Sequence, residues 1–164
     1  DTSMTDSANE ITHAIAERWD ESSSTWIDAG PHADKSGSCR TLDALLPLLV
    51  VEEKQLPPKL VEQFDSVEAF KGQFGPRGVH LKEKVFNPKQ YWRGPVWPQL
   101  SYLISLAVSR FDLQTAKQLT LATANGAQAS GCAEYWHPET GEGLGAIPQS
   151  WAGLSLVSTK RLLS

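Results

Sequence analysis

Apolar residues recur with helical spacing over most of the chain, which predicts an all-α fold. Over residues 7–19, Ile11, Ile15 and Trp19 return at intervals of four and therefore share one helix face. Residues 42–51 are apolar almost all round, so a helix there must be buried on several sides. The predicted helices cover residues 7–19, 41–51, 57–70, 95–110, 113–129 and a last stretch that begins at Pro148.

Capping signals indicate where these helices begin. Residues 7–10, Ser-Ala-Asn-Glu, have the form of a capping box, and Thr41 and Asp112 can cap the helices that follow them. Pro95 and Pro98 lie within the first turn of their helix, where proline is accepted. Short connections between consecutive helices favour packing as helical hairpins.

Two segments interrupt the helical pattern. Residues 25–28, Thr-Trp-Ile-Asp, follow a polar turn and read as a short extended piece. Residues 72–94 are punctuated by glycine and proline, and Val79, Leu81 and Val85 favour one or two short strands there. A loop of this length in a compact domain usually has a functional reason.

Residues 133–143 form the segment richest in reactive side chains. They contain three glutamates, Tyr135, Trp136, one histidine and two glycines besides Pro138, so a continuous helix is ruled out. Aromatic rings stack on the apolar faces of sugars, and carboxylates perform acid–base work on glycosidic bonds. The other interpretation is a solvated acidic turn that Tyr135 and Trp136 anchor to the core. From these residues alone, the two interpretations stay equally open.

Composition and charge exclude several classes of protein. The chain has 164 residues, 40% hydrophobic and 21% charged, enough for one globular domain with a real core. A net charge of −4 without any basic stripe argues against a nucleic-acid partner. No apolar run is long enough to span a bilayer, so no membrane partner is expected. No phosphate-cradling glycine loop or dinucleotide fingerprint occurs, so no cofactor is expected either.

Cysteine usage points to a reducing compartment. Cys39 and Cys132 are far apart and fit no metal-ligand spacing. Two buried thiols are the preferred interpretation, and a disulfide between them is the alternative. A cytoplasmic location follows from the preferred interpretation.

Three blocks, in this order, resemble a known enzyme family. The first comprises residues 18–28 and 40–48, with Arg18-Trp19-Asp20-Glu21 at its start. The second is Tyr91-Trp92-Arg93-Gly94-Pro95-Val96-Trp97-Pro98, which is also similar to a signature of the trehalases. The third runs from Glu134 to Gly143 and ends in Gln149-Ser150-Trp151. Together they resemble the C-terminal half of six-hairpin glycosidases, in particular the bacterial branch of glycoside hydrolase family 63, which includes glucosylglycerate and mannosylglycerate hydrolases.

The resemblance implies both a fold and a reaction. The fold is an (α/α)6 barrel, with helices in two concentric rings around a central funnel for the sugar. The reaction is inverting hydrolysis by two carboxyl groups, which stand roughly 6.5–9.5 Å apart on either side of the sugar ring. The general base maps onto Glu134. The general acid is an aspartate in a tryptophan-rich loop of the N-terminal half, and no such loop occurs here.

The chain is too short for the whole barrel. Residues 1–164 are therefore expected to be the C-terminal portion of the catalytic domain. They need the N-terminal half of the same barrel, or another copy of the chain, to complete it. The small carbohydrate substrate is an α-glucoside or α-mannoside such as a glycosylglycerate. The alternative is a helical domain without catalysis, which binds carbohydrate or serves as a scaffold.

The candidate catalytic residue is Glu134, and the alternative for it is a salt bridge to a nearby arginine. Arg93 is expected to bind a substrate hydroxyl or carboxylate, or to orient Glu134. Glu139 and Glu142 are expected to shape the turn, and His137 among the glutamates lacks a recognisable ligand spacing, so no metal site is expected. The candidate substrate-binding residues are Tyr91, Trp92, Arg93, Trp136, Gln149 and Trp151, with Trp151 and Trp97 expected to serve packing at least in part.

Overall fold

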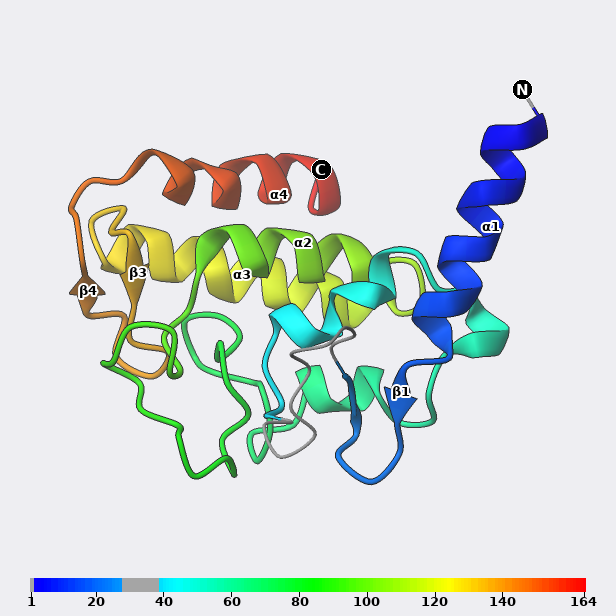
Figure 1. Cartoon of the computed structure of the whole chain (residues 1–164). Helices are drawn as coiled ribbons and strands as arrows, with labels where there is room; N and C mark the ends of the chain where they lie inside the picture. Colours follow the sequence, from blue (N-terminus) through cyan, green and yellow to red (C-terminus); the bar gives the residue numbers. More distant parts are fainter. Residues whose placement is uncertain (1, 28–38) are drawn as a thin grey trace.

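The computed structural model describes residues 2–27 and 39–164. Four α-helices dominate it, and the predicted all-α class is confirmed. Helices α2, α3 and α4 pack against one another as helical hairpins, while α1 extends away from them (Figure 1). The α-helices are α1 (Thr2–Ala16), α2 (Pro98–Val108), α3 (Leu113–Ala129) and α4 (Leu154–Leu162).

Helix α3 begins where its capping signal predicts. The Asp112 carboxylate accepts hydrogen bonds from the backbone N–H groups of Gln114 at 2.9 Å and Thr115 at 3.0 Å. These bonds satisfy two of the donors that a helix start leaves free. The predicted span 113–129 is confirmed, and the helix predicted over 95–110 is α2.

Helix α1 differs from the prediction at both ends. It begins at Thr2, so the capping box expected at Ser7 is wrong: the Ser7 hydroxyl instead donates to the Ser3 carbonyl at 3.0 Å within the helix. Trp19, expected on the helix, lies in strand β1 (Trp19–Asp20). This strand pairs antiparallel with β2 (Thr25–Trp26), which confirms the predicted extended piece; Asp28 lies outside the described residues.

Three of the predicted helices are wholly or partly 3-10 helices. The stretch expected over 41–51 is η2, with Pro47 inside it, and the Val50 N–H bonds the Pro47 carbonyl at 2.9 Å in the tighter 3-10 pattern. The stretch from 57 to 70 contains only η4, and the last helix starts as η5 before α4. The 3-10 elements are η2 (Asp43–Leu49), η3 (Glu53–Gln55), η4 (Val61–Phe64) and η5 (Ser150–Gly153).

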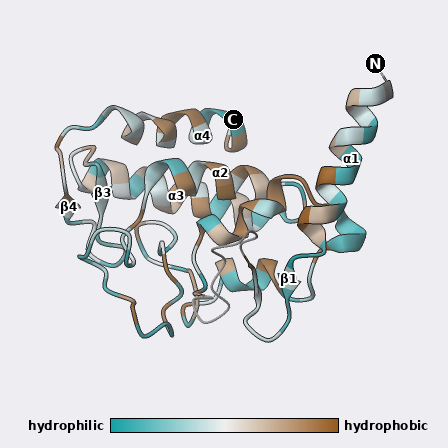
Figure 2. Cartoon of the chain, viewed as in Figure 1, coloured by the Kyte–Doolittle hydropathy of each residue, from teal (hydrophilic) through white to brown (hydrophobic). Residues whose placement is uncertain are grey.

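The main core lies where α2 meets η2, α3 and α4. Helix α2 is largely hydrophobic in Figure 2, and it packs against all three of these elements. The expectation that residues 42–51 are buried is confirmed for four apolar side chains of this stretch. Those four are Leu42, Leu45, Leu48 and Val51, and other fully buried core residues are Phe64, Phe70, Trp97, Ile104 and Val108.

The long segment 72–94 holds less strand than predicted. Val79 forms one isolated bridge with Thr41, and within the described residues no strand passes through Leu81 or Val85. The acidic segment after α3 is a hairpin and not an irregular loop. Its strands are β3 (Tyr135–Trp136) and β4 (Gly143–Leu144), paired antiparallel.

Both cysteines are free thiols, but they are not both buried. Cys39 is half-buried, and burial is the main cause that raises the pKa of its thiol. Cys132 is exposed, so the expectation of two buried thiols is wrong for this residue. The cytoplasmic location stays a prediction. Among the described helices, none combines the length and the apolar character needed to cross a membrane.

Candidate active site

Glu134 stands directly before strand β3, held at both its backbone and its side chain. Its N–H donates to the Ala146 carbonyl at 2.8 Å, and its carbonyl accepts from the Trp151 indole N–H at 2.7 Å. On the side chain, Oε2 accepts from the Ala146 N–H at 3.1 Å. The Tyr91 hydroxyl approaches Oε1 at 3.5 Å, the long end of hydrogen-bond distances. Each carboxylate oxygen therefore has its own neighbour.

The other two glutamates of the hairpin are paired with cations. Glu139 accepts a charge-assisted bond from buried Arg77 at 2.5 Å. Glu142 pairs with Lys89 at 2.7 Å, and this hydrogen bond holds the pKa of the Glu142 carboxyl below its usual value. Glu134 has no ion pair within residues 2–27 and 39–164, so the alternative of a structural salt bridge to an arginine finds no support.

Tyr91, the neighbour of Oε1, belongs to a cluster of aromatic rings. Trp97 is fully buried, as expected for a packing residue, and stacks on Trp92 at 3.9 Å and on Tyr135 at 4.6 Å between ring centroids. The Trp97 ring also meets Trp151 edge to face at 6.2 Å. Trp92 is 46% exposed, so its ring presents an accessible aromatic surface.

Trp92 has an unusual backbone conformation. Its φ of +54° lies in the left-handed region, which a bulky residue occupies only when its surroundings impose it. The stack on Trp97 supplies such surroundings. The conformation holds the Trp92 ring at the surface beside exposed Tyr91, and strain of this kind is common at ligand-binding sites.

Tyr135, which the sequence suggested only as an anchor to the core, is a neighbour of the site. Its ring lies 5.4 Å from that of Tyr91. Burial raises the pKa of the Tyr135 hydroxyl, and the adjacent Glu134 carboxylate adds to this effect. The phenol therefore stays protonated next to the carboxylate.

Trp136 is not the exposed sugar platform that the sequence suggested. It is fully buried in a small cluster with Val96 and Ala127, and its indole N–H donates to the Phe74 carbonyl at 2.7 Å. Gly126 of α3 lies against the indole so closely that any side chain there would overlap it. The physical reason is the bridge between Trp136 and Val96, which turns the ring inward.

Of the two remaining candidates, Arg93 is exposed and Gln149 is half-buried. The Arg93 side chain is exposed and has no ion pair or hydrogen bond with the rest of the described chain, so the expectation that it orients Glu134 finds no support. Gln149 caps η5: its side-chain oxygen accepts from the Ser150 N–H at 2.8 Å. Its backbone N–H donates to the Cys132 carbonyl at 2.8 Å.

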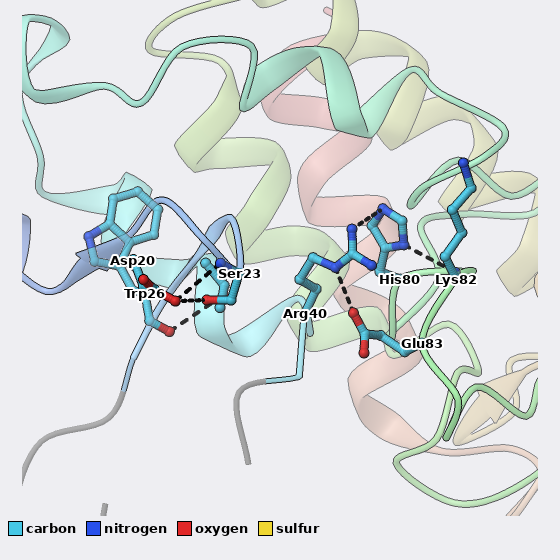
Figure 3. A network of polar contacts seen from close by, with 8 residues as sticks. Asp20, Ser23, Trp26, Arg40, His80, Lys82 and Glu83 are labelled. Atoms are coloured by element: carbon cyan, nitrogen blue, oxygen red, sulfur yellow. Dashed lines mark hydrogen bonds and ion pairs between the residues drawn. The ribbon is translucent and has the colours of Figure 1, made fainter. Parts of the chain in front are cut away.

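A second polar network joins Arg40 to the segment from His80 to Glu83 (Figure 3). Arg40 donates to Glu83 at 2.6 Å, and its Nη1 lies 3.2 Å from Nε2 of buried His80. The His80 Nδ1 accepts from the Lys82 N–H at 3.1 Å. Burial, and then the Arg40 charge, lower the pKa of His80 to about 4, so the ring is neutral. The network fixes residue 40 against the 80–83 segment.

Asp20 does not have the properties of a general acid. Its carboxylate accepts hydrogen bonds from Ser23 and Ser22, and these bonds lower its pKa (Figure 3). A general acid needs a raised pKa in order to hold its proton.

No cluster of metal-binding side chains occurs in the described part of the chain.

The sequence matches the family described as the mannosylglycerate hydrolase MGH1-like glycoside hydrolase domain over residues 1–152. The chain belongs to this family. The resemblance drawn from the three sequence blocks is thereby confirmed. Proteins similar to this chain include a glucosylglycerate hydrolase from Mycolicibacterium hassiacum, 40% identical over 73 residues, which are 44% of this chain and 16% of that protein.

Two further relatives cover more of the chain. A mannosylglycerate hydrolase from Thermus thermophilus is 26% identical over 144 residues, 87% of this chain and 35% of that protein. The crystal structure of a family 63 mannosylglycerate hydrolase from Thermus thermophilus in complex with glucose superposes with a TM-score of 0.75 at 21% identity, over 92% of this chain and 38% of that one. The chain thus spans well under half the length of these relatives.

Proposed function

We propose that this chain supplies the general base, Glu134, of an inverting glycoside hydrolase that acts on an α-linked glycosylglycerate. One observation carries the proposal. Of the three hairpin glutamates, Glu139 and Glu142 are engaged by Arg77 and Lys89, and Glu134 alone lacks a cationic partner among the described residues. A carboxylate held by neutral donors keeps a lone pair available for a proton.

The reaction follows from the position of Glu134. Oε1, the oxygen beside the Tyr91 hydroxyl, takes a proton from a water molecule, and the resulting hydroxide adds to the anomeric carbon. The bond from that carbon to the glycerate oxygen breaks on the opposite face, where an acid returns a proton to the departing oxygen. The two carboxyl groups stand roughly 6.5–9.5 Å apart in such a site. Glu134 cannot do both jobs, so a second carboxyl group acts as the acid, and the family resemblance implies an aspartate of the N-terminal half.

The aromatic surface next to Glu134 is the proposed sugar platform. Trp92, exposed and fixed by its stack on Trp97, presents a ring to the apolar face of the pyranose. Tyr91 reaches the same space from beside Oε1 of Glu134. Gln149 is assigned to a sugar hydroxyl through its amide N–H groups. Trp151 contributes only its ring to the sugar platform, because its indole N–H already donates to the Glu134 carbonyl.

The glycerate carboxylate is assigned to Arg93. An exposed guanidinium without a protein partner is suited to a bidentate carboxylate contact. The substrate class is supported by the relatives named glucosylglycerate hydrolase and mannosylglycerate hydrolase. A further family 63 structure from Thermus thermophilus is a complex with Tris and D-glycerate.

The site is completed by a part of the barrel that lies outside these residues. The N-terminal half of the same barrel, or another copy of the chain, supplies the aspartate acid and covers the apolar residues that α1 and α4 expose. These include Met4, Ile11 and Leu156, which are 73%, 61% and 73% exposed. The 164 residues alone are therefore expected to be inactive on glucosylglycerate, mannosylglycerate and aryl α-glucosides.

The test is hydrolysis by the completed assembly, followed by proton NMR of the anomeric signals. We expect turnover of glucosylglycerate or mannosylglycerate, with the β-anomer of the free sugar appearing first. Early α-anomer would contradict an inverting base at Glu134. Binding of the sugar without any hydrolysis would favour the carbohydrate-binding alternative, for which exposed Trp92 and Tyr91 would suffice. Turnover by the verified 164-residue chain alone would refute the need for a second segment.

A further inference from the structure

Gly145, directly after strand β4, touches the candidate base. A Cβ atom at this position would lie 2.5 Å from Oε2 of Glu134 and 2.7 Å from Cε1 of Tyr135. Real Cβ atoms do not approach other atoms so closely. The residue also has a φ of +72°, in the region that favours glycine.

The residue after Gly145 bonds the same oxygen. The Ala146 N–H donates to Oε2 of Glu134 at 3.1 Å, and the Ala146 carbonyl accepts from the Glu134 N–H at 2.8 Å. Ala146 thus holds Glu134 through its backbone atoms alone. Backbone donors have few conformations, so they fix a carboxylate more tightly than a long side chain would.

We propose that Gly145 is a positioning residue for the base, an inference that rests on the proposed function of Glu134. The missing side chain at Gly145 lets the carboxylate lie flat against the backbone, where the Ala146 N–H holds Oε2. Oε1 is then the oxygen that takes the proton from water, next to the Tyr91 hydroxyl. The two oxygens of Glu134 have different tasks.

A side chain at position 145 intrudes on the carboxylate and also on the Tyr135 ring, whose Cε1 would lie 2.7 Å from the added Cβ atom. Oε2 is the far end of a flexible side chain, so it turns aside when a Cβ atom intrudes. The base then leaves its bond to Ala146 and its place beside Tyr91. A misplacement of about 1 Å costs on the order of 10²-fold in rate.

The chain offers a matched control at Gly131. This glycine has a φ of +69°, nearly that of Gly145, but an added Cβ atom would meet only Cγ2 of Ile147, at an ordinary 3.6 Å. Gly131→Ala therefore imposes the same kind of backbone strain without a clash at the base. Any difference between the two alanine variants isolates the contact with Glu134 and its neighbour Tyr135.

The first experiment measures kcat and KM for both variants in the completed, active assembly. We expect Gly145→Ala to lose on the order of 10²-fold in kcat with KM changed less than about threefold. Gly131→Ala is expected to keep kcat within about threefold of wild type while its Tm falls. Equal kcat values for the two variants would overturn the proposal.

A second experiment needs no turnover. The 1H–15N signal of the Ala146 amide is followed against pH in the same assembly, for wild type and for Glu134→Gln. We expect the chemical shift of this amide to follow the ionisation of a carboxyl group in wild type. In Glu134→Gln the chemical shift should lose that response. If the Ala146 amide signal responds to pH in neither protein, the proposed hold of Ala146 on Oε2 is overturned, even if Glu134 proves to be the base. A fully active Glu134→Gln would overturn the proposed function and this role together.

Discussion

The indole N–H of Trp151 donates a hydrogen bond of 2.7 Å to the backbone carbonyl of Glu134. Trp151 belongs to η5, and Glu134 precedes β3, so this bond ties the start of the last helical segment to the hairpin. The Trp151 ring also packs edge to face against buried Trp97. Trp151 thus fixes the backbone of Glu134, as Ala146 fixes the side chain.

Trp151→Phe tests this tie. The substitution keeps an aromatic ring but leaves the part-buried Glu134 carbonyl without its donor, which costs about 1–2 kcal/mol of stability. We expect kcat to fall by about tenfold with a small change in KM, because the base shifts while the sugar contacts remain. Trp92→Phe is the comparison, since it reduces the exposed platform and should act mainly on KM. The reverse pattern, with Trp151→Phe acting on KM alone, would mean that Trp151 serves the sugar platform and does not position the base.

Arg77 anchors the tip of the hairpin from a distant segment. Its guanidinium donates to the carbonyls of Val67 at 3.0 Å and Ala69 at 3.1 Å, and to the Glu139 carboxylate. Arg77→Met leaves these buried or partly buried acceptors unpaired and should destabilise the fold by about 2–3 kcal/mol. Urea denaturation provides the measurement. Lys89→Met, which breaks the exposed pair with Glu142, should cost less than about 1 kcal/mol. Equal losses for the two variants would mean that burial of Arg77 matters less than the structure implies.

The helices that were predicted correctly owe their bounds to local signals. The span 113–129 follows from Asp112, whose capping bonds need only the next three residues. Residues 43–49 form a 3-10 helix because Pro47 and the surrounding core override the apolar pattern. The two-residue strands of the hairpin are too short to show a period of two, so the sequence could only indicate a loop there.

The sequence could identify some site residues and not others, because some of the contacts that decide their roles join residues far apart in the chain. Glu134 was found through the family resemblance, and the structure adds that it lies free of cations within the described residues. The burial of Trp136 was missed because its hydrogen-bond partner, Phe74, is 62 residues away. The pair between Arg77 and Glu139 spans the same separation. No pattern in one sequence reports contacts of this kind.

His80 should make stability depend on pH. Its folded pKa of about 4 lies below the ordinary 6.5, chiefly through burial and then through Arg40, with Glu83 opposing. Between these values the unfolded chain binds a proton that the folded chain does not, so stability falls as pH drops from 6.5 toward 4. The loss is at most about 3 kcal/mol. His80→Asn, which keeps an acceptor near the Lys82 N–H, should flatten this slope in urea denaturation between pH 4 and 7. A slope unaltered in His80→Asn would refute the assignment.

The central claim is that Glu134, and neither of its neighbours in the hairpin, is the base. Glu134→Gln keeps the volume and the hydrogen-bonding reach of the side chain but removes its ability to take a proton. We expect a loss in kcat on the order of 10²–10⁴-fold with little change in substrate affinity. Glu139→Gln and Glu142→Gln break only the pairs with Arg77 and Lys89 and should keep most of the activity.

The most direct measurement is therefore a pH–rate profile of wild type and these three glutamine variants in the completed assembly. The account predicts that the fall in rate on acidification disappears only from the residual activity of Glu134→Gln, together with the large loss in kcat. Near-normal kcat in Glu134→Gln, with the loss appearing in Glu139→Gln or Glu142→Gln, would contradict it.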